Sequence, residues 1–171
     1  MALYTGITYS GFKAVDARID SLVVGTVVSA SAPVSAGSTL TVTAALHAGR
    51  TIALDALAGS TVTLPAATGT GNVYTFVTKV LATSNSHVIK VANATDVLSG
   101  SLSVVDNADG TVTTFGTVAA SDTITLNRTT TGSVKIGERI NIIDVAAGFF
   151  SVTGTVIATG SEATPFSATV S

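Results

Sequence analysis

The chain has 171 residues, of which only 11% are Asp, Glu, Lys or Arg, and its formal net charge is −2. An ordinary globular domain has about 25% charged residues, and this chain has neither the basic cluster that binds nucleic acid nor a cationic amphipathic stretch for a membrane surface. It also contains no cysteine, which excludes disulfides, thiolate catalysis and cysteine-based metal sites.

The apolar residues are of types that favour β-strands. Hydrophobic residues make up 46% of the chain, yet Trp is absent and other aromatic residues are few. Val and Thr, which are abundant, are β-branched and favour strands. Because so few charges are present, we expect part of the apolar surface to be buried between subunits, where the low net charge offers little repulsion.

Residues 1–12 carry no charge and interleave large apolar side chains with small polar ones. Loose chain ends are normally polar and poor in aromatic residues. The segment is therefore expected either to dock on another chain as an extended arm or to form the first strand of the chain's own sheet. No Lys or Arg precedes an apolar run, so a secretory signal peptide is not expected. The anchors predicted for the docking arm are Leu3, Tyr4, Ile7, Tyr9 and Phe12.

Two short segments follow. Val15, Ile19 and Leu22 recur at helical spacing and indicate one or two helical turns within residues 13–22. Residues 29–37 are small and interrupted by Pro and Gly, which is typical of a linker. We therefore place an N-terminal arm and linker at residues 1–37, and a β domain at residues 38–171.

From residue 39 onward, apolar residues alternate with threonine and other small residues. This period of two places one set of side chains in a core and the Thr hydroxyls outside. The segments with this pattern are 39–43, 51–54, 61–64, 72–81, 87–91, 102–105, 111–115, 123–126, 140–145 and 149–158.

Turn signals separate these segments. Asn107–Gly110 has the composition of a hairpin turn with Gly in the left-handed conformation, and Gly69–Asn72 is a second turn. Many short strands separated by turns predict an all-β fold, an antiparallel β-sandwich or a jelly-roll-like barrel, rather than βαβ units. Because no repeat has a fixed period, a β-helix or solenoid is not expected.

The histidines and the acidic loops do not form a recognisable catalytic or metal-binding pattern. His47 and His87 have no carboxylate near them in sequence and are interpreted as structural, and a zinc site is not expected. Asp106–Gly110 resembles a calcium loop superficially, but Ala108 stands where an EF-hand has its third ligand, so we interpret the segment as a hairpin turn. A calcium site built from carboxylates of several different loops remains an alternative.

Other chemistry has little support. Gly69-x-Gly71 precedes a strand, whereas a dinucleotide-binding loop opens a helix. Without Trp, and with few acids, the sequence identifies no sugar-cleaving cleft. We expect no catalytic residue, no cofactor and no metal, and keep a small β-sandwich hydrolase as a competing hypothesis. Most acids lie at expected turns, where side-chain capping explains them: Asp55, Asp96, Asp106, Asp109 and Asp122.

An ordered series of short motifs resembles the tailed-bacteriophage virion proteins described as head decoration or head fibre proteins. The resemblance covers about three quarters of the chain, roughly residues 46–171, and the string VTLPAATGTG is its most distinctive part. The motifs are LHAGRTI (46–52), AGSTVTLPAATGTG (58–71), YTF (74–76), SNSHVIKVANATD (84–96), DTITLNRTTTG (122–132) and GSEATPF (160–166).

The resemblance implies a β-rich module on the outer surface of a phage capsid, present as a homo-oligomer, a trimer, that binds neighbouring subunits of the major capsid protein. It implies localisation in the virion after assembly in the host cytoplasm, with no catalytic residues, no cofactor, and no nucleic-acid or membrane partner. An alternative is a tail-fibre or adhesive module that recognises the host. Our own hypothesis is that the N-terminal arm supplies the capsid-binding residues.

Overall fold

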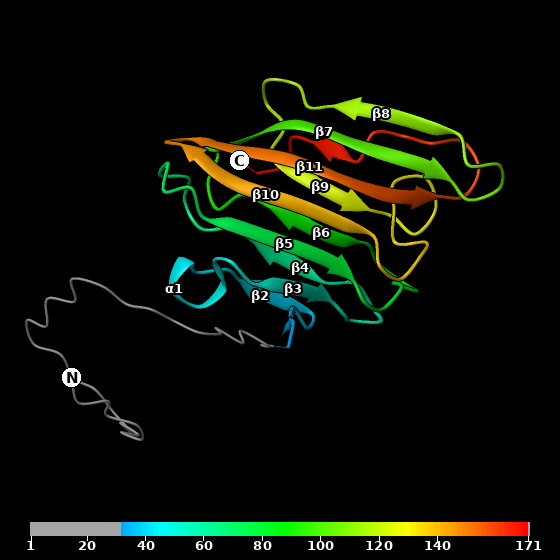
Figure 1. Ribbon diagram of the computed structural model, residues 1–171, viewed down its shortest axis with the longest axis horizontal. Helices are drawn as coiled ribbons and strands as arrows, with labels where there is room; N and C mark the ends of the chain where they lie inside the picture. The colour runs from blue at the N-terminus through cyan, green and yellow to red at the C-terminus, as the bar shows by residue number, and fades with distance from the viewer. Residues whose placement is uncertain (1–31, 171) are drawn as a thin grey trace, which may run out of the picture. The chain divides into compact units, whose positions relative to one another are not determined.

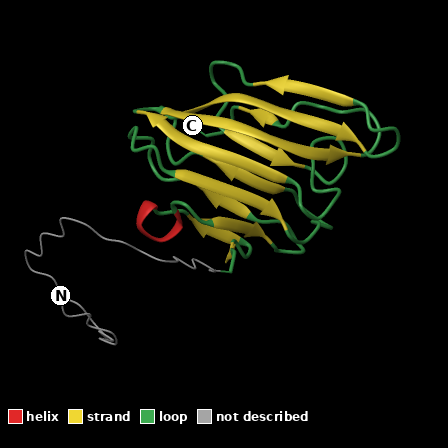
Figure 2. Cartoon of the chain, in the orientation of Figure 1, coloured by secondary structure: helices red, strands yellow, loops and turns green. Residues whose placement is uncertain are grey.

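The computed structural model of the chain describes residues 32–170. The predicted arm anchors, the predicted helix at 13–22 and part of the predicted linker lie outside these residues. Within the described part, the elements are strands apart from one short helix (Figure 2). The elements are β1 (Val34–Ser35), β2 (Thr39–Thr41), α1 (Ala44–His47), β3 (Thr51–Leu54), β4 (Thr61–Thr63), β5 (Val73–Thr78), β6 (His87–Lys90), β7 (Val97–Asp106), β8 (Val112–Gly116), β9 (Thr123–Leu126), β10 (Arg139–Ala146), β11 (Phe149–Ala158) and β12 (Phe166–Ser167).

The strands form two sheets that face each other (Figure 1). The seven-stranded sheet has the order β1-β3-β5-β10-β11-β7-β8, and the five-stranded sheet has the order β12-β9-β6-β4-β2. The predicted all-β sandwich is therefore confirmed. The strand β1 lies inside the predicted linker and pairs with Ile52 and Ala53 of β3, so the folded region starts before residue 38.

The first six strands wind as a coil. The chain alternates between the two sheets, so that β1, β3 and β5 pair in parallel in one sheet, and β2, β4 and β6 pair in parallel in the other. The expected antiparallel, jelly-roll-like arrangement is wrong for this half, because period-two alternation fixes the face of each side chain but not the strand direction. A coil arises without a sequence repeat because its connections differ in length.

The later strands complete both sheets, mainly by antiparallel pairing. Strand β10 pairs antiparallel with β5 and with β11, and β9 pairs antiparallel with β6 and with β12. One long parallel pair, between β7 and β11, is the exception. The predicted hairpin joins β7 to β8, and β8 forms one edge of the seven-stranded sheet.

The core lies between the two sheets and contains the apolar members of the alternating pattern. Ile52, Phe76 and Ile140 are level with one another across the seven-stranded sheet and are buried. Val62, Ile89 and Ile124 do the same in the five-stranded sheet. Burying one such side chain stabilises the fold by about 1.5–3 kcal/mol. The faces predicted for these strands are thus confirmed.

Candidate docking surface

The connections between strands gather at two ends of the sandwich. Strands β3, β5, β7 and β11 begin at one end and finish at the other, whereas β10 and β8 run the opposite way. We call the end that holds α1 the apolar end and the opposite end the charged end (Figure 1). The apolar end comprises residues 42–50, 64–73, 91–96, 117–122 and 144–149; the charged end comprises residues 36–38, 55–60, 79–86, 106–112, 127–139 and 159–165.

Large hydrophobic side chains are exposed across the apolar end, from α1 to the segment after β8. Val118 and Phe149 are 72% and 50% exposed and line a small hollow of about 170 Å³ together with Val97 and Thr117. Exposed apolar groups that gather in one place on a protein commonly mark an interaction site. The exposed large hydrophobic residues of this end are Leu46, Val73, Val118, Val145 and Phe149, compared with Leu57, Val112 and Ile136 at the other.

Exposed charges have the opposite distribution. Five charged side chains of residues 32–170 are exposed, and all lie at the charged end: Lys79, Asp109, Arg128, Lys135 and Arg139. At the apolar end, Arg50 is half-buried and donates hydrogen bonds to the carbonyls of Leu46 (3.4 Å) and Ala32 (3.2 Å). The carboxylates of the apolar end are buried, and Arg50 and Lys90, the last residue of β6, are half-buried, so the exposed side chains of this surface carry no charge.

Asp144 of β10 is the most extensively bonded of these buried carboxylates. Its oxygens accept hydrogen bonds from the backbone N–H groups of Thr68 (2.9 Å), Gly69 (2.6 Å) and Thr70 (3.2 Å), and from the hydroxyls of Thr68 (3.2 Å) and Thr70 (2.7 Å). Burial opposes ionisation, but these hydrogen bonds outweigh it and hold the pKa of Asp144 below its ordinary value of 3.8. The carboxylate thus fixes the TGTG loop of the most distinctive motif.

Two further acids anchor loops at this end. Asp96 accepts hydrogen bonds from the N–H of Ala67 (2.9 Å) and the side chain of Asn93 (2.8 Å). Asp122 accepts hydrogen bonds from the N–H groups of Thr169 (2.8 Å) and Val170 (3.0 Å), which ties down the C-terminal segment. Burial opposes ionisation of Asp122, yet its hydrogen bonds keep its pKa below 3.8. The prediction that these acids cap their own turns is wrong, because both accept backbone hydrogen bonds from segments distant in sequence.

A buried carboxylate also anchors a loop at the charged end. Glu138 is buried and accepts hydrogen bonds from the N–H groups of Ser133 (2.6 Å), Val134 (2.7 Å) and Lys135 (2.7 Å). Here burial outweighs the hydrogen bonds and raises the pKa of Glu138 above 4.5. The carboxylate therefore holds the loop before β10 and, unlike the exposed Lys135 and Arg139, does not face solvent.

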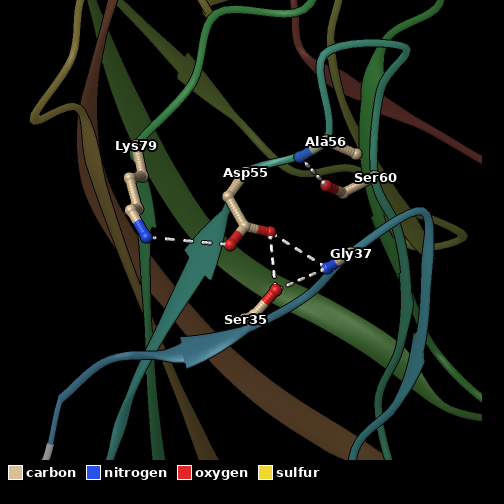
Figure 3. A network of polar contacts seen from close by, with 6 residues as sticks. All are labelled: Ser35, Gly37, Asp55, Ala56, Ser60 and Lys79. Atoms are coloured by element: carbon tan, nitrogen blue, oxygen red, sulfur yellow. Dashed lines mark hydrogen bonds and ion pairs between the residues drawn. The ribbon is translucent and has the colours of Figure 1, made fainter.

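Asp55 joins the first coils of the sandwich (Figure 3). Its Oδ1 accepts hydrogen bonds from the Ser35 hydroxyl and the Gly37 N–H, both at 3.0 Å, and its Oδ2 lies 3.9 Å from Nζ of Lys79. The Lys79 side chain is 62% exposed and the separation is long, so this ion pair contributes little. Because Ser35, Asp55 and Lys79 follow or end neighbouring strands, Asp55 holds these strands in register at the charged end.

The hairpin interpretation of Asp106–Gly110 is confirmed. Asp106 Oδ1 accepts a hydrogen bond from the Ala108 N–H (2.6 Å), and Asp109 Oδ1 accepts one from the Thr111 N–H (2.8 Å). Gly110 adopts the left-handed conformation, with φ of +79°, which a side chain would disfavour. The two carboxylates stabilise the turn in the way expected from short polar side chains.

The two histidines lie at opposite ends and each serves a loop. His47 Nδ1 accepts a hydrogen bond from the Thr43 N–H (2.9 Å) at the apolar end. His87 Nδ1 accepts one from the Ser60 N–H (2.9 Å), and its Nε2 lies 2.8 Å from the Val80 carbonyl. Burial lowers the pKa of His87. Residues 32–170 contain no group of three His, Cys, Asp or Glu side chains placed to hold a metal ion.

The sequence interpretation missed Asp144 and Glu138 as loop anchors. Asp144 occupies an inward position in the alternation that contains Ile140 and Ile142, and an acid in a buried position of a strand is a signal that could have identified it. The predicted docking residues Leu3, Tyr4, Ile7, Tyr9 and Phe12 lie outside the described residues. No helix of the described part is long and apolar enough to cross a membrane.

No family model, no curated protein and no solved structure matches the chain. The fold and the surface describe an all-β sandwich with one end at which the exposed large side chains are apolar.

Proposed function

We propose that the protein is a phage virion structural protein that decorates the outer surface of the capsid and stabilises it by binding neighbouring subunits of the major capsid protein. The observation that carries the proposal is the unequal distribution of charge: five of the eight exposed large hydrophobic side chains lie at the apolar end, whereas all exposed charged side chains of the described residues lie at the other end. This distribution favours attachment by the apolar end, with the charged end in solvent.

The roles of the polar side chains favour a binding function over catalysis. The buried carboxylates and both histidines form hydrogen bonds to loop backbone or neighbouring side chains of the same chain. Their perturbed pKa values have a structural cause, because burial and loop N–H groups account for them. We therefore assign the polar groups to the fold and the function to the surface.

A decorating protein needs only modest contacts per copy. A specific interface typically buries about 1,200–2,000 Å² in total, and several weaker contacts on one oligomer add up through avidity. The proposed assembly is a homo-oligomer, a trimer on the basis of the motif resemblance. Three apolar ends facing one shell could then bind firmly even if each contact is weak alone.

Electron microscopy of the phage that encodes the chain tests the location. An antibody against the protein should label the heads at many regular positions, including heads that lack tails. Labelling of tail fibres alone would contradict the proposal and support the host-recognition alternative. Absence of the protein from purified particles would contradict both.

A matched pair of variants tests the attachment surface. Val118 and Ile136 are both 72% exposed, but they lie at opposite ends. The double variant V118K/V145K should bind undecorated heads at least about tenfold more weakly, since a buried unpaired charge costs more than about 1.4 kcal/mol. The control I136K/L57K should bind within about twofold of the unchanged protein. Equal binding by both variants would contradict attachment by the apolar end.

A further inference from the structure

Strand β8 is the one free sheet edge of more than three residues within residues 32–170. The other edge strands, β1, β12 and β2, have two, two and three residues, whereas β8 has five. Natural proteins usually protect such an edge with a charged residue, a proline or a bulge. The sequence of β8 and its flanks, Thr111–Thr117, contains neither charge nor proline, and its pairing with β7 shows no register shift.

The hydrogen bonds at both ends of β8 show which of its backbone groups are free. The Asp106 N–H donates to the Thr111 carbonyl (2.8 Å), and the Thr117 N–H donates to the Gly100 carbonyl (2.9 Å). In an antiparallel pair, residues whose backbone groups face the partner strand alternate with residues whose groups face away. Counting inward from Thr111 and from Thr117, the N–H and C=O groups of Val112, Thr114 and Gly116 point away from β7.

We propose that this edge pairs with β8 of a second copy of the chain, antiparallel and about a twofold axis at Thr114. In this register Thr114 lies opposite Thr114 of the second copy, and Val112 lies opposite Gly116, so each of these residues both donates and accepts a backbone hydrogen bond. The absence of charge means that two identical edges meet without repulsion. The Val112 side chain, 56% exposed, then faces a residue that has no side chain.

This pairing is independent of the proposed attachment to a capsid. It uses the edge of the seven-stranded sheet, whereas the proposed attachment uses the apolar end. A twofold contact can also link copies that belong to different trimers, so it adds to the proposed oligomer and does not replace it. Backbone pairing at a sheet edge is a common way for two chains to associate.

Cysteine cross-linking tests the register, since the chain has no cysteine of its own. Full-length T114C should form a disulfide-linked dimer on mild oxidation, because a twofold axis at Thr114 brings the two Cα atoms to about 5.5 Å, within the range of about 4.4–6.8 Å that a disulfide needs. V112C is the matched control on the same strand and face. Its two copies would lie about 14 Å apart, four residues at about 3.4 Å each, too far for a disulfide.

A dimer from T114C and none from V112C supports the proposal. No dimer from either variant, or equal yields from both, overturns it. A second measurement uses T114P, which removes an N–H that does not serve β7, and T114V, which keeps it; proline is tolerated at such an edge position. In sedimentation experiments, the T114P assembly should have half the mass of the T114V assembly. Equal masses for the two variants would also overturn the pairing. Because both measurements use the isolated protein, a failed capsid-binding test leaves their outcome unaffected.

Discussion

The two ends of the sandwich are built in the same way but present different surfaces. At the apolar end, Asp96, Asp122 and Asp144 are buried and accept hydrogen bonds from loop N–H groups. At the charged end, Glu138 does the same for the loop before β10. Yet the charged end exposes lysines and arginines beside three large hydrophobic side chains, whereas the apolar end exposes five large hydrophobic side chains and no exposed charge among them.

The comparison of the two ends separates residues that stabilise the fold from residues that are available for contact with another molecule. Loops of both ends are held by buried acceptors, so the fold does not require exposed hydrophobic side chains at either end. Exposed apolar residues add little to the stability of the isolated chain. Their concentration at one end is therefore better explained by contact with another surface than by the needs of the sandwich.

Among the substitutions considered at the apolar end, removal of the Asp144 carboxylate should cause the largest loss of folding stability. Asp144→Ala leaves the Thr68, Gly69 and Thr70 donors without their acceptor, and should lower the free energy of unfolding by about 2–4 kcal/mol. Urea denaturation would measure the loss. The control is Asp109→Ala, because Asp109 lies in an exposed turn and accepts one backbone hydrogen bond. This substitution should lower the free energy of unfolding by distinctly less. Equal losses would show that the TGTG loop does not depend on its anchor.

Asp144 at the apolar end and Glu138 at the charged end should make the stability depend on pH in opposite directions. The pKa of Asp144 lies below 3.8 in the folded chain, so its contribution is complete above pH 3.8 and is lost as the pH falls through the folded value. The pKa of Glu138 lies above 4.5, so its contribution is present below pH 4.5 and is lost as the pH rises through the folded value.

Urea midpoints measured between pH 3 and 7 would check both signs. The advantage of the unchanged protein over Asp144→Asn should shrink as the pH falls below about 3.8, and its advantage over Glu138→Gln should shrink as the pH rises above about 4.5. Differences that stay constant over this range would contradict the assignment of these shifts to the two carboxylates.

The smallest effect on stability should come from the displayed side chains themselves. Val118→Ser and Ile136→Ser remove equally exposed groups at opposite ends, and each should change the free energy of unfolding by no more than about 0.5 kcal/mol. Thermal unfolding would measure both. A loss above about 1.5 kcal/mol for Val118→Ser alone would show that the apolar end serves the fold, which would remove the main support for a docking surface.

Much of the fold could be predicted because each strand carries its own signal. The alternation of Ile52 and Leu54, or of Ile140 and Ile142, predicts the buried face, and Asp109-Gly110 predicts the hairpin turn. Strand direction could not be predicted from these patterns. A parallel and an antiparallel neighbour require the same alternation, so the coil of β1 to β6 is visible only in the register of the sheets.

The candidate surface was less predictable. Its members Leu46, Val118 and Phe149 are far apart in sequence and lie in unrelated local patterns, so composition could indicate only that apolar surface had to be covered somewhere. The role of Asp144 likewise depends on the loop at 68–70, more than seventy residues earlier.

Local sequence patterns are enough to predict an all-β chain and the buried faces of the recognised strands, and the composition shows a shortage of charge. The coil topology, the location of the exposed apolar groups and the free edge of β8 are visible only once the strands are paired. Side-chain alternation and turn propensity act between neighbours in sequence, whereas strand order and the placing of loops at one end depend on which distant segments share hydrogen bonds.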